Sequence, residues 1–297
     1  MVTRKTVFLL IGLFVLSFGY GQSTGHGKYK HISRLKVISR DLPTRINESS
    51  GLIYFRNKLW THNDSGDGPF IYVIDTSGRN IEQIITLKNA RNIDWEEITQ
   101  DDKYIYMGDF GNNYGFRNRM TIYRIKKDAI PDAVDASVNA DSIVFSYNNK
   151  PMPVTKKWVR SDYDCEAMIV YNDTLILFSK NWQGPKCNIY VIPAIPGTYE
   201  ISPVQTIIPD GLITAAALSP DKTKLLLLGY KDYCPFVYLI NKFNPHKITL
   251  KKAVHKYYSA KLGFQTEGIT FVSPDEAYIS CEKNKLKPST LFRVRFW

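Results

Sequence analysis

The sequence has few of the residues, and none of the motifs, on which the common hydrolytic mechanisms depend. Of its 297 residues only five are histidine and four are cysteine. It contains no G-x-S-x-G, no H-E-x-x-H, no phosphate-binding glycine loop and no EF-hand loop. These absences argue against covalent serine or cysteine catalysis. The cysteine spacing matches no zinc pattern, and without an arginine-rich run or a nucleic-acid motif we expect no nucleic-acid partner.

Long hydrophobic runs are also lacking, apart from one at the N-terminus that is short for a bilayer span. Two basic residues precede this apolar run, 7–15, and Gly19 and Gly21 fit the small-residue positions of a cleavage site. We interpret residues 1–21 as a secretory signal peptide, with an uncleaved anchor as the alternative. Because no cysteine lies near the cleavage site, we do not expect a bacterial lipid anchor. No later apolar stretch is long enough to span a membrane. We therefore expect a secreted or periplasmic monomer whose residues 22–297 form a single β-propeller domain.

Acidic residues are outnumbered, 28 to 39, so the chain carries a formal net charge of +11. A basic surface attracts phosphates, polyanions or acidic membranes, although a generally basic surface without a specific partner is the preferred interpretation. The four cysteines permit disulfides in an exported protein. Cys187 and Cys234 are the best candidate pair, whereas Cys165 is expected to lie in the core.

The composition favours strands, and the chain repeats itself. Tyr and Phe are abundant, at 19 and 15 residues, and aromatic residues prefer strands. One short pattern, two small or acidic residues followed by an aliphatic one, recurs about every 50 residues with one longer interval. Its five copies are 50–52, 96–98, 166–168, 216–218 and 267–269. Such a period is typical of propeller blades with four strands each.

Each copy is followed by a polar turn, an apolar strand, a polar loop and an aromatic-rich strand. A fourth strand follows in the first four units, but the fifth unit ends after three. Residues 30–39, ahead of the first unit, can supply the missing outer strand and close the ring. We therefore predict an all-β, five-bladed β-propeller. The alternative is six blades, if the long second unit hides another one, but we interpret its extra length, 126–158, as an insertion.

The repeat also predicts which residues share a face of the disc. In each blade the start of the innermost strand lies at the same face as the end of the second strand. The inner-strand starts carry acids at three equivalent positions, Glu96, Glu166 and Glu267, with Ser50 at a fourth. Glu97 is expected to alternate to the other side of its strand.

Like charges gathered around one channel require a cation or protons to offset them. Oxygen ligands of this kind suit a hard cation. We therefore predict Ca²⁺, or another hard divalent cation, bound by Glu96, Glu166 and Glu267 with help from Ser50. The alternative is a water-filled channel lined by hydrogen-bonded acids.

Two loops at the ends of second strands are the most specific motifs, THNDSGD at 61–67 and GDFGNN at 108–113. A self-capping turn explains either one alone, but both on the face of the acid ring favour a site. Candidate catalytic residues are Asp64 and Asp109, as a general base or a second metal site, and His62, for which a packed histidine is the preferred interpretation. Candidate ligand-binding residues are Asn63, Asp67, Asn112, Asn113, Arg117, Lys180 and Lys283. The cations among them suit an anionic group such as a phosphate, although a solvated rim explains each one singly.

At these motifs the chain resembles a broad family of exported bacterial β-propeller proteins. The segments that carry the resemblance are ESSGL, THNDSGD, DWEEI, GDFGNN, DCEAM, ITAAALSP and QTEGI, which span nearly all of the mature chain. The family is similar to phytase-like or esterase-like propellers and to TolB- and NHL-like propellers. The set Ser50, Glu96, Glu166 and Glu267 also resembles the central Ca²⁺ site of the five-bladed calcium-activated nucleotidases, or apyrases. Ala216 departs from that pattern because its side chain offers no ligand, and a fold alone does not fix a function.

Two functions stay open at this point. The first is a metal-dependent hydrolase of a small anionic ester, such as a phosphoester. The second is a non-catalytic propeller that uses the same face to hold a glycan, a peptide or a partner protein, with a structural metal.

Overall fold

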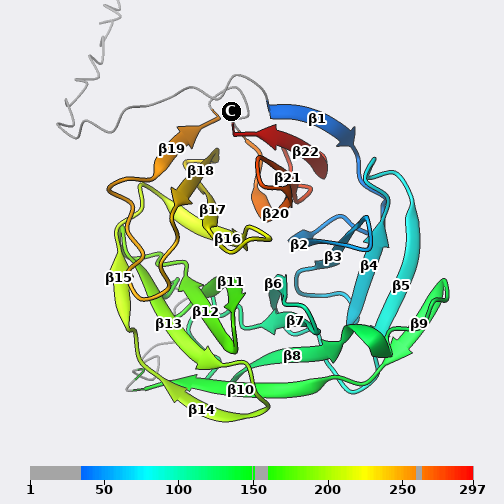
Figure 1. Cartoon of the computed structure of the whole chain (residues 1–297), viewed down its shortest axis with the longest axis horizontal. Helices are drawn as coiled ribbons and strands as arrows, with labels where there is room; N and C mark the ends of the chain where they lie inside the picture. The colour runs from blue at the N-terminus through cyan, green and yellow to red at the C-terminus, as the bar shows by residue number, and fades with distance from the viewer. Residues whose placement is uncertain (1–34, 149, 151–159, 259–262, 297) are drawn as a thin grey trace, which may run out of the picture.

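The computed structural model describes residues 35–148, 150, 160–258 and 263–296. The predicted signal peptide lies outside these residues. Within them, twenty-two strands form five antiparallel-based sheets arranged as a ring, with one short 3-10 helix, η1 (Lys127–Ala129) (Figure 1). The prediction of an all-β, five-bladed propeller is confirmed, and the six-bladed alternative is wrong.

Each blade runs outward from an inner strand near the axis. Blade 1 contains β2 (Ser49–Phe55), β3 (Lys58–Asn63), β4 (Phe70–Ile74) and β5 (Ile81–Leu87). Blade 2 contains β6 (Trp95–Gln100), β7 (Tyr104–Asp109), β8 (Met120–Lys126) and β10 (Asp141–Tyr147). Blade 3 contains β11 (Cys165–Tyr171), β12 (Thr174–Ser179), β13 (Cys187–Pro193) and β15 (Gln205–Ile207). Blade 4 contains β16 (Leu212–Leu218), β17 (Lys224–Lys231), β18 (Cys234–Asn241) and β19 (Val254–Tyr257).

Blade 5 is completed by the other end of the chain. Its first three strands are β20 (Thr266–Ser273), β21 (Glu276–Cys281) and β22 (Thr290–Arg295), and its outer strand is β1 (Leu35–Arg40). β1 pairs antiparallel with β22, so that Val37 lies opposite Phe292. The predicted closure by the segment before the first unit is confirmed for the residues that the structure describes.

Two further strands link neighbouring blades. β9 (Asp135–Val138) leaves blade 2 and pairs parallel with β5 of blade 1, and β14 (Gly197–Ile201) leaves blade 3 and pairs parallel with β10. The interpretation of residues 126–158 as an insertion is therefore corrected. Their described part supplies the outer strand of blade 2 and an added strand that covers the edge of blade 1.

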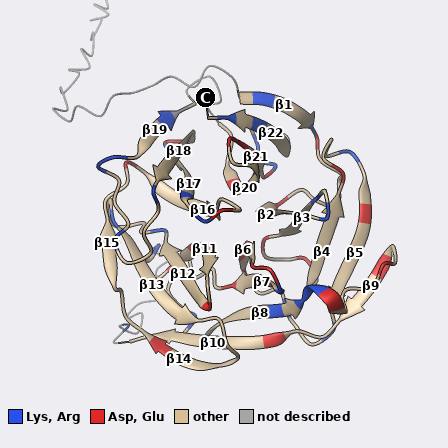
Figure 2. Cartoon of the chain, in the orientation of Figure 1, with Lys and Arg blue, Asp and Glu red and all other residues tan. Residues whose placement is uncertain are grey.

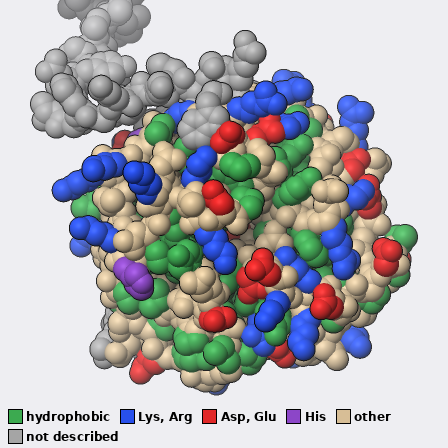
Figure 3. Space-filling view, viewed as in Figure 1, with side chains coloured by type: hydrophobic (Ala, Val, Ile, Leu, Met, Phe, Trp, Pro, Cys, Tyr) green, Lys and Arg blue, Asp and Glu red, His purple; other side chains and the backbone are tan. Residues whose placement is uncertain are grey.

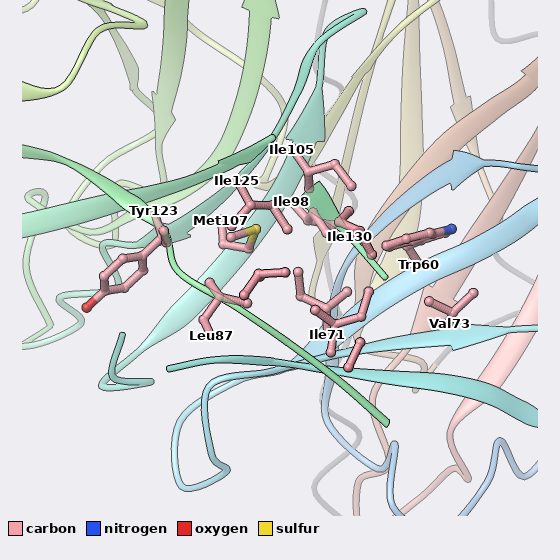
Figure 4. Close-up of a cluster of buried hydrophobic side chains, with 14 of the residues drawn as sticks. Trp60, Ile71, Val73, Leu87, Ile98, Ile105, Met107, Tyr123, Ile125 and Ile130 are labelled. Atoms are coloured by element: carbon pink, nitrogen blue, oxygen red, sulfur yellow. The ribbon is translucent and has the colours of Figure 1, made fainter. Parts of the chain in front are cut away.

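The core is divided into five clusters of buried side chains, one for each pair of neighbouring blades. Figure 4 shows the cluster between blades 1 and 2, where Trp60 and Ile71 of one sheet meet Ile98 and Met107 of the next. A sheet alternates its side chains between two faces, so each blade buries both faces against its neighbours. The ring therefore holds the inner strands in fixed positions around the axis.

The predicted disulfide between Cys187 and Cys234 is wrong, since all four cysteines are free. Cys187 is 1% exposed and packs in the cluster between blades 3 and 4, whereas Cys234 begins β18 on the next sheet. Cys165 lies in the core between blades 2 and 3, as predicted.

Charged residues occur all around the ring (Figure 2). On the face shown in Figure 3, lysines and arginines are interspersed with acidic residues around a shallow central hollow. Among the described residues, no helix has both the length and the apolar character needed to cross a bilayer.

Candidate functional site

A β-bulge at the start of each inner strand sets one residue apart in every blade. The pairing register skips a residue near the beginning of β2, β6, β11, β16 and β20, and the skipped residues are Ser50, Glu96, Glu166, Thr214 and Glu267. All five are buried. A bulge turns a side chain away from the direction that regular alternation would give it. The predicted equivalence of Ser50 with the three glutamates therefore has a backbone basis.

The same bulges correct the predicted alignment of blade 4. The residue equivalent to Glu96 is Thr214, two positions before Ala216. The Thr214 hydroxyl donates a hydrogen bond to the carbonyl of Thr266 in the next blade, at 2.6 Å. The fourth blade thus contributes an oxygen where an alanine methyl group was expected.

In four of the five blades a backbone hydrogen bond then fixes the loop that follows the second strand. Beyond the β2–β3 pair the Asp64 amide donates to the carbonyl of Glu48, and in blade 3 the Lys180 amide donates to Asp164. In blade 5 the Glu282 amide donates to Gln265. These bonds extend the ladder by one step and hold the side chains of Asp64, Lys180 and Glu282 over the axis.

These elements enclose a cavity of about 800 Å³ at one face of the disc. Six of the predicted site residues line it: Asp64, Glu96, Asn113, Glu166, Lys180 and Glu267. Glu282 adds a further carboxylate to its wall. Like charges that are this close together and shielded from water are costly unless a cation or protons compensate them.

Oxygen atoms of the acids form two groups that share Glu96. In one group Asp64, Asp94 and Glu96 each place one oxygen within 4.8 Å of the others, and Glu96, Asp164 and Glu166 do the same in the second. Oxygens bound to a common Ca²⁺ at 2.3–2.6 Å lie at most about 5 Å apart. Both groups therefore have the spacing of a hard-cation site.

The surroundings of these acids oppose their ionisation. Burial raises the pKa of Glu96 well above its ordinary value, and the charges of Glu166 and Asp64 raise it further. Burial also raises the pKa of Asp94 to about 7, with Asp64 and Asp164 acting in the same direction. A bound cation would compensate the charge and favour the deprotonated forms.

Glu267 is a buried acid whose carboxylate has no hydrogen-bond donor among the described residues. Its side chain is 3% exposed, and neither carboxylate oxygen accepts a hydrogen bond. Burial raises its pKa to about 7 against the opposing charge of Lys180. Gln265 and Thr214 lie close by, but they donate their hydrogen bonds to Glu282 and to the Thr266 carbonyl instead. Buried carboxylates normally have donors, so this one indicates a missing partner in the cavity.

Lys180 is the buried cation of the site. Its Nζ lies 3.0 Å from Oε2 of Glu166, and the residue is 5% exposed. Burial lowers its pKa, but the charges of Glu166 and Glu267 outweigh that effect and the pKa stands well above its ordinary value. The ion pair with Glu166 therefore favours the charged form of the ammonium.

The THNDSGD loop contributes Asp64 to the cavity and holds its other side chains in place. The Asn63 amide donates to Asp67 and to the Arg45 carbonyl, at 2.7 and 2.8 Å. His62 is 0% exposed, lies edge-on to the Trp95 ring, and has a pKa that burial lowers to about 4. His62, Asn63 and Asp67 thus lie away from the cavity wall, as the packed interpretation of His62 expects.

In the GDFGNN loop, too, most polar side chains bond within the loop and few face the cavity. Asp109 pairs with the Arg117 guanidinium at 2.9 Å, and that guanidinium also donates to the carbonyl of Gly111. Asn112 exchanges two hydrogen bonds with the Arg117 backbone. Asp109, Asn112 and Arg117 therefore brace the loop, and Asn113 is the member that reaches the cavity.

The backbone at Gly111 approaches two of the carboxylates so closely that a side chain there would displace them. A Cβ atom there would lie 2.1 Å from Oε1 of Glu96 and 2.4 Å from Oδ2 of Asp94. The loop backbone therefore packs directly against the first group of carboxylates.

Two remaining predicted residues lie beside the cavity without lining it. Ser50 donates to the carbonyl and to Oε2 of Glu96, at 3.2 and 3.4 Å, so it orients that glutamate. Lys283 has an exposed side chain, and its amide donates to the Asn47 carbonyl.

The expectation that Glu97 faces away from the channel is wrong, because the bulge before it breaks the alternation. Glu97 is 0% exposed. Its Oε1 accepts from the Ile98 amide, and its Oε2 accepts from the Ala216 amide of blade 4 at 2.9 Å. This carboxylate spans the axis and joins the inner strands of blades that are not neighbours.

Sequence reasoning did not select Asp94, Asp164 and Glu282 as site residues. A signal for the first two exists, since each stands two positions before a ring glutamate, in DWE and DCE. Glu282 follows a second strand as Asp64 does, but its local sequence gives no comparable motif.

Aromatic side chains form one side of the cavity mouth. Trp182 donates a hydrogen bond from Nε1 to Asp164 at 2.8 Å. The Arg160 guanidinium lies over the Trp182 ring, 3.7 Å from the ring centroid. Tyr230 and Tyr233 stack with 5.9 Å between centroids and an interplanar angle of 2°. Tyr233 is 53% exposed.

No family model matches the chain, and no curated protein matches it in sequence. Among solved structures it is similar to a luciferin-regenerating enzyme, with a TM-score of 0.47 and 11% identity over 88% of this chain and 95% of that one. It is also similar to regucalcin, titled a calcium-binding protein, from Agrobacterium tumefaciens, with a TM-score of 0.43 and 9% identity over 91% and 95%. A chain of a nidogen–laminin complex has a TM-score of 0.43 and 12% identity over 82% of each chain. Similarity at this level carries no argument about function.

Proposed function

We propose that this propeller is exported and binds a hard divalent cation, Ca²⁺ in the first instance, in the carboxylate-lined cavity. The observation that supports this most is the imbalance of buried charge. The acids Asp64, Asp94, Glu96, Asp164, Glu166, Glu267 and Glu282 surround a single buried ammonium, that of Lys180. Oxygen donors alone favour a hard cation over zinc or copper.

The chemistry we propose for the site is hydrolysis of a small anionic ester, such as a phosphoester. A divalent cation bound there would polarise the ester oxygen and stabilise developing charge. Asp64 lines the cavity, where it could activate the attacking water either as a ligand of the cation or as the proton acceptor. Asp109 is the second candidate base, but its ion pair with Arg117 favours a positioning role.

The test is metal analysis of the purified protein, followed by a phosphatase and nucleotidase screen with and without chelator. We expect at least one Ca²⁺ ion bound per protein chain, and ester turnover that chelation abolishes. Asp64→Asn should then lower kcat more than it changes KM. Absence of bound metal, or of metal-dependent turnover on every ester, would remove the hydrolase from consideration.

The aromatic mouth of the cavity favours a second candidate function, the binding of a glycan without catalysis. Aromatic faces stack on sugar rings, and neighbouring amides and carboxylates such as Gln183 and Asp232 can bond their hydroxyls. In that case Tyr233→Ala should abolish retention on a glycan array while the melting temperature stays constant. If the partner is instead a peptide or a protein, the chain should be retained by an immobilised protein ligand and not by the glycan array.

A further inference from the structure

The two oxygen groups of the cavity are adjacent and share the carboxylate of Glu96. Asp64 comes from the loop between β3 and β4 of blade 1, and Asp94 comes from the loop that leads into β6 of blade 2. Asp164 and Glu166 come from the start of blade 3, and Glu96 belongs to both groups. Clustered acids alone do not make a cation site. The unbonded carboxylate of Glu267, 3% exposed and in the wall of the same cavity, is the independent sign that a cationic partner belongs there.

The second group already contains a cation supplied by the chain. Lys180 Nζ lies 3.0 Å from Glu166, 4.9 Å from the Trp182 ring centroid and 5.6 Å from that of Tyr230. The ion pair and the two cation–π contacts together stabilise the ammonium at this position. Asp164 in the same group accepts from the Asn112 amide and from the Trp182 indole, at 2.7 and 2.8 Å.

The first group has no such cation. Among the described residues, no lysine or arginine forms an ion pair with Asp64, Asp94 or Glu96. The nearest guanidinium, that of Arg117, is bonded to Asp109 and to two backbone carbonyls. Gly111 meanwhile keeps the loop backbone tight against Glu96 and Asp94.

We propose that the protein binds one divalent cation, at Asp64, Asp94 and Glu96, and that the Lys180 ammonium fills the adjacent position as a built-in second cation. This rests on the proposed function and narrows the metal site from the whole carboxylate-lined cavity to one of its two oxygen groups. An anionic oxygen entering the cavity would then meet a metal ion and a fixed ammonium side by side. Such a pairing selects a ligand with two anionic oxygens on one atom, as in a phosphoryl or carboxylate group.

The test counts Ca²⁺ by calorimetric titration and by elemental analysis after dialysis. The wild-type chain should bind one equivalent, Lys180→Met should bind two, and Lys180→Arg, which keeps the charge, should bind one. Two equivalents in the wild type, or one in Lys180→Met, would overturn the assignment of Lys180 while leaving a divalent-cation site intact. No binding at all would overturn the proposed function as well, so the two failures are distinguishable.

A second pair of variants decides the matter if Lys180→Met does not fold. Asp94→Asn and Glu166→Gln each replace one carboxyl group of the two oxygen groups by an amide, but only Asp94 is a proposed ligand. We expect Asp94→Asn to weaken Ca²⁺ binding at least tenfold more than Glu166→Gln does. Equal losses, or a larger loss for Glu166→Gln, would contradict the proposed location.

Discussion

At the scale of single residues, Glu96 and Glu97 are neighbours in the chain with opposite surroundings. Glu96 faces a cavity of other carboxylates, where its charge is opposed. Glu97 has its oxygens bonded to backbone amides of blade 2 and blade 4. Buried amides near the axis need acceptors, so Glu97 holds the inner strands together while Glu96 is left for a ligand.

Replacing Glu97 by alanine should destabilise the ring. The change leaves the Ile98 and Ala216 amides without their acceptor, and each unsatisfied buried group costs about 1–3 kcal/mol. We expect the free energy of unfolding to fall by about 3 kcal/mol in urea denaturation. Glu97→Gln, which retains one acceptor oxygen, is the control and should lose less; an alanine variant within about 1 kcal/mol of wild type would contradict the bracing role.

The raised pKa of Glu267 predicts that the free energy of unfolding of the metal-free chain falls as the pH rises. Burial raises its folded pKa to about 7 from an ordinary value of 4.5, so the unfolded chain releases this proton at a lower pH than the folded chain does. Without metal, stability is therefore full below about pH 4.5 and is lost progressively up to about pH 7. Glu267→Gln should abolish a loss on the order of 3 kcal/mol.

The measurement is urea unfolding in the presence of chelator between pH 4.5 and 8, for the wild type and for Glu267→Gln. The difference in free energy between the two should grow with pH and level off above pH 7. A difference that is constant across this range would mean that Glu267 has a cation or donor of its own without added metal.

At the scale of secondary-structure elements, the ring is held by strands that leave their own place in the chain. β1 comes from the beginning of the described chain and completes blade 5, while β9 and β14 each cover the edge of the preceding blade. An uncovered edge offers unpaired backbone groups to other chains. These three strands therefore protect the ring against opening and against edge-to-edge association.

Removing β1 should have a large effect. A chain that begins at Asp41 lacks Leu35 and Val37, which pack against the cluster between blades 4 and 5, and Ile38, which packs against the cluster between blades 5 and 1. At about 1–2 kcal/mol for each of the three side chains, the loss is roughly 3–6 kcal/mol. A chain that begins at Leu35 is the matched control and should melt as the full chain does.

Light scattering of the two truncated chains gives a second readout. The one without β1 exposes the edge of β22 and should associate at concentrations where the control stays dispersed. Equal melting temperatures and equal scattering would show that β1 does not close the ring in solution.

At the scale of the whole molecule, the charge is divided in an unusual way. The chain carries a formal net charge of +11, yet the cavity on its axis gathers acids around one buried lysine. A basic exterior draws small anions toward the protein, but the cavity itself repels them until a cation is bound. Metal binding should therefore precede the binding of any anionic ligand.

Ca²⁺ should stabilise the whole ring, because its ligands come from separate blades. At a free concentration of 100 times the dissociation constant, binding contributes about 2.7 kcal/mol, which is about 5–10 °C in melting temperature for a chain of this size. The shift should increase from pH 5 to pH 8, since the carboxylates must lose their protons. Differential scanning calorimetry with chelator, Ca²⁺ or Mg²⁺ measures it, and we expect the smallest shift with Mg²⁺, which dehydrates reluctantly.

Much of the site was predictable, and the parts that were missed share a cause. Glu96, Glu166, Glu267, Asp64 and Lys180 follow from the repeat, because equivalent positions of a propeller meet at one face. The blade 4 alignment failed at Ala216 and the direction of Glu97 was wrong, since both depend on bulges. A bulge adds one residue without a composition signal, so alternation alone does not reveal it.

The sequence by itself determined the number of blades, the closure of the ring by its own N-terminal strand, and the face on which acids gather. These follow from periodicity and from the need to pair strand edges, which act locally or by simple repetition. Only the tertiary structure decided which carboxylates touch, that Lys180 reaches Glu166, and that Glu267 has no donor. Such facts depend on the distance and dielectric between side chains far apart in the chain, and those exist only once the ring has closed.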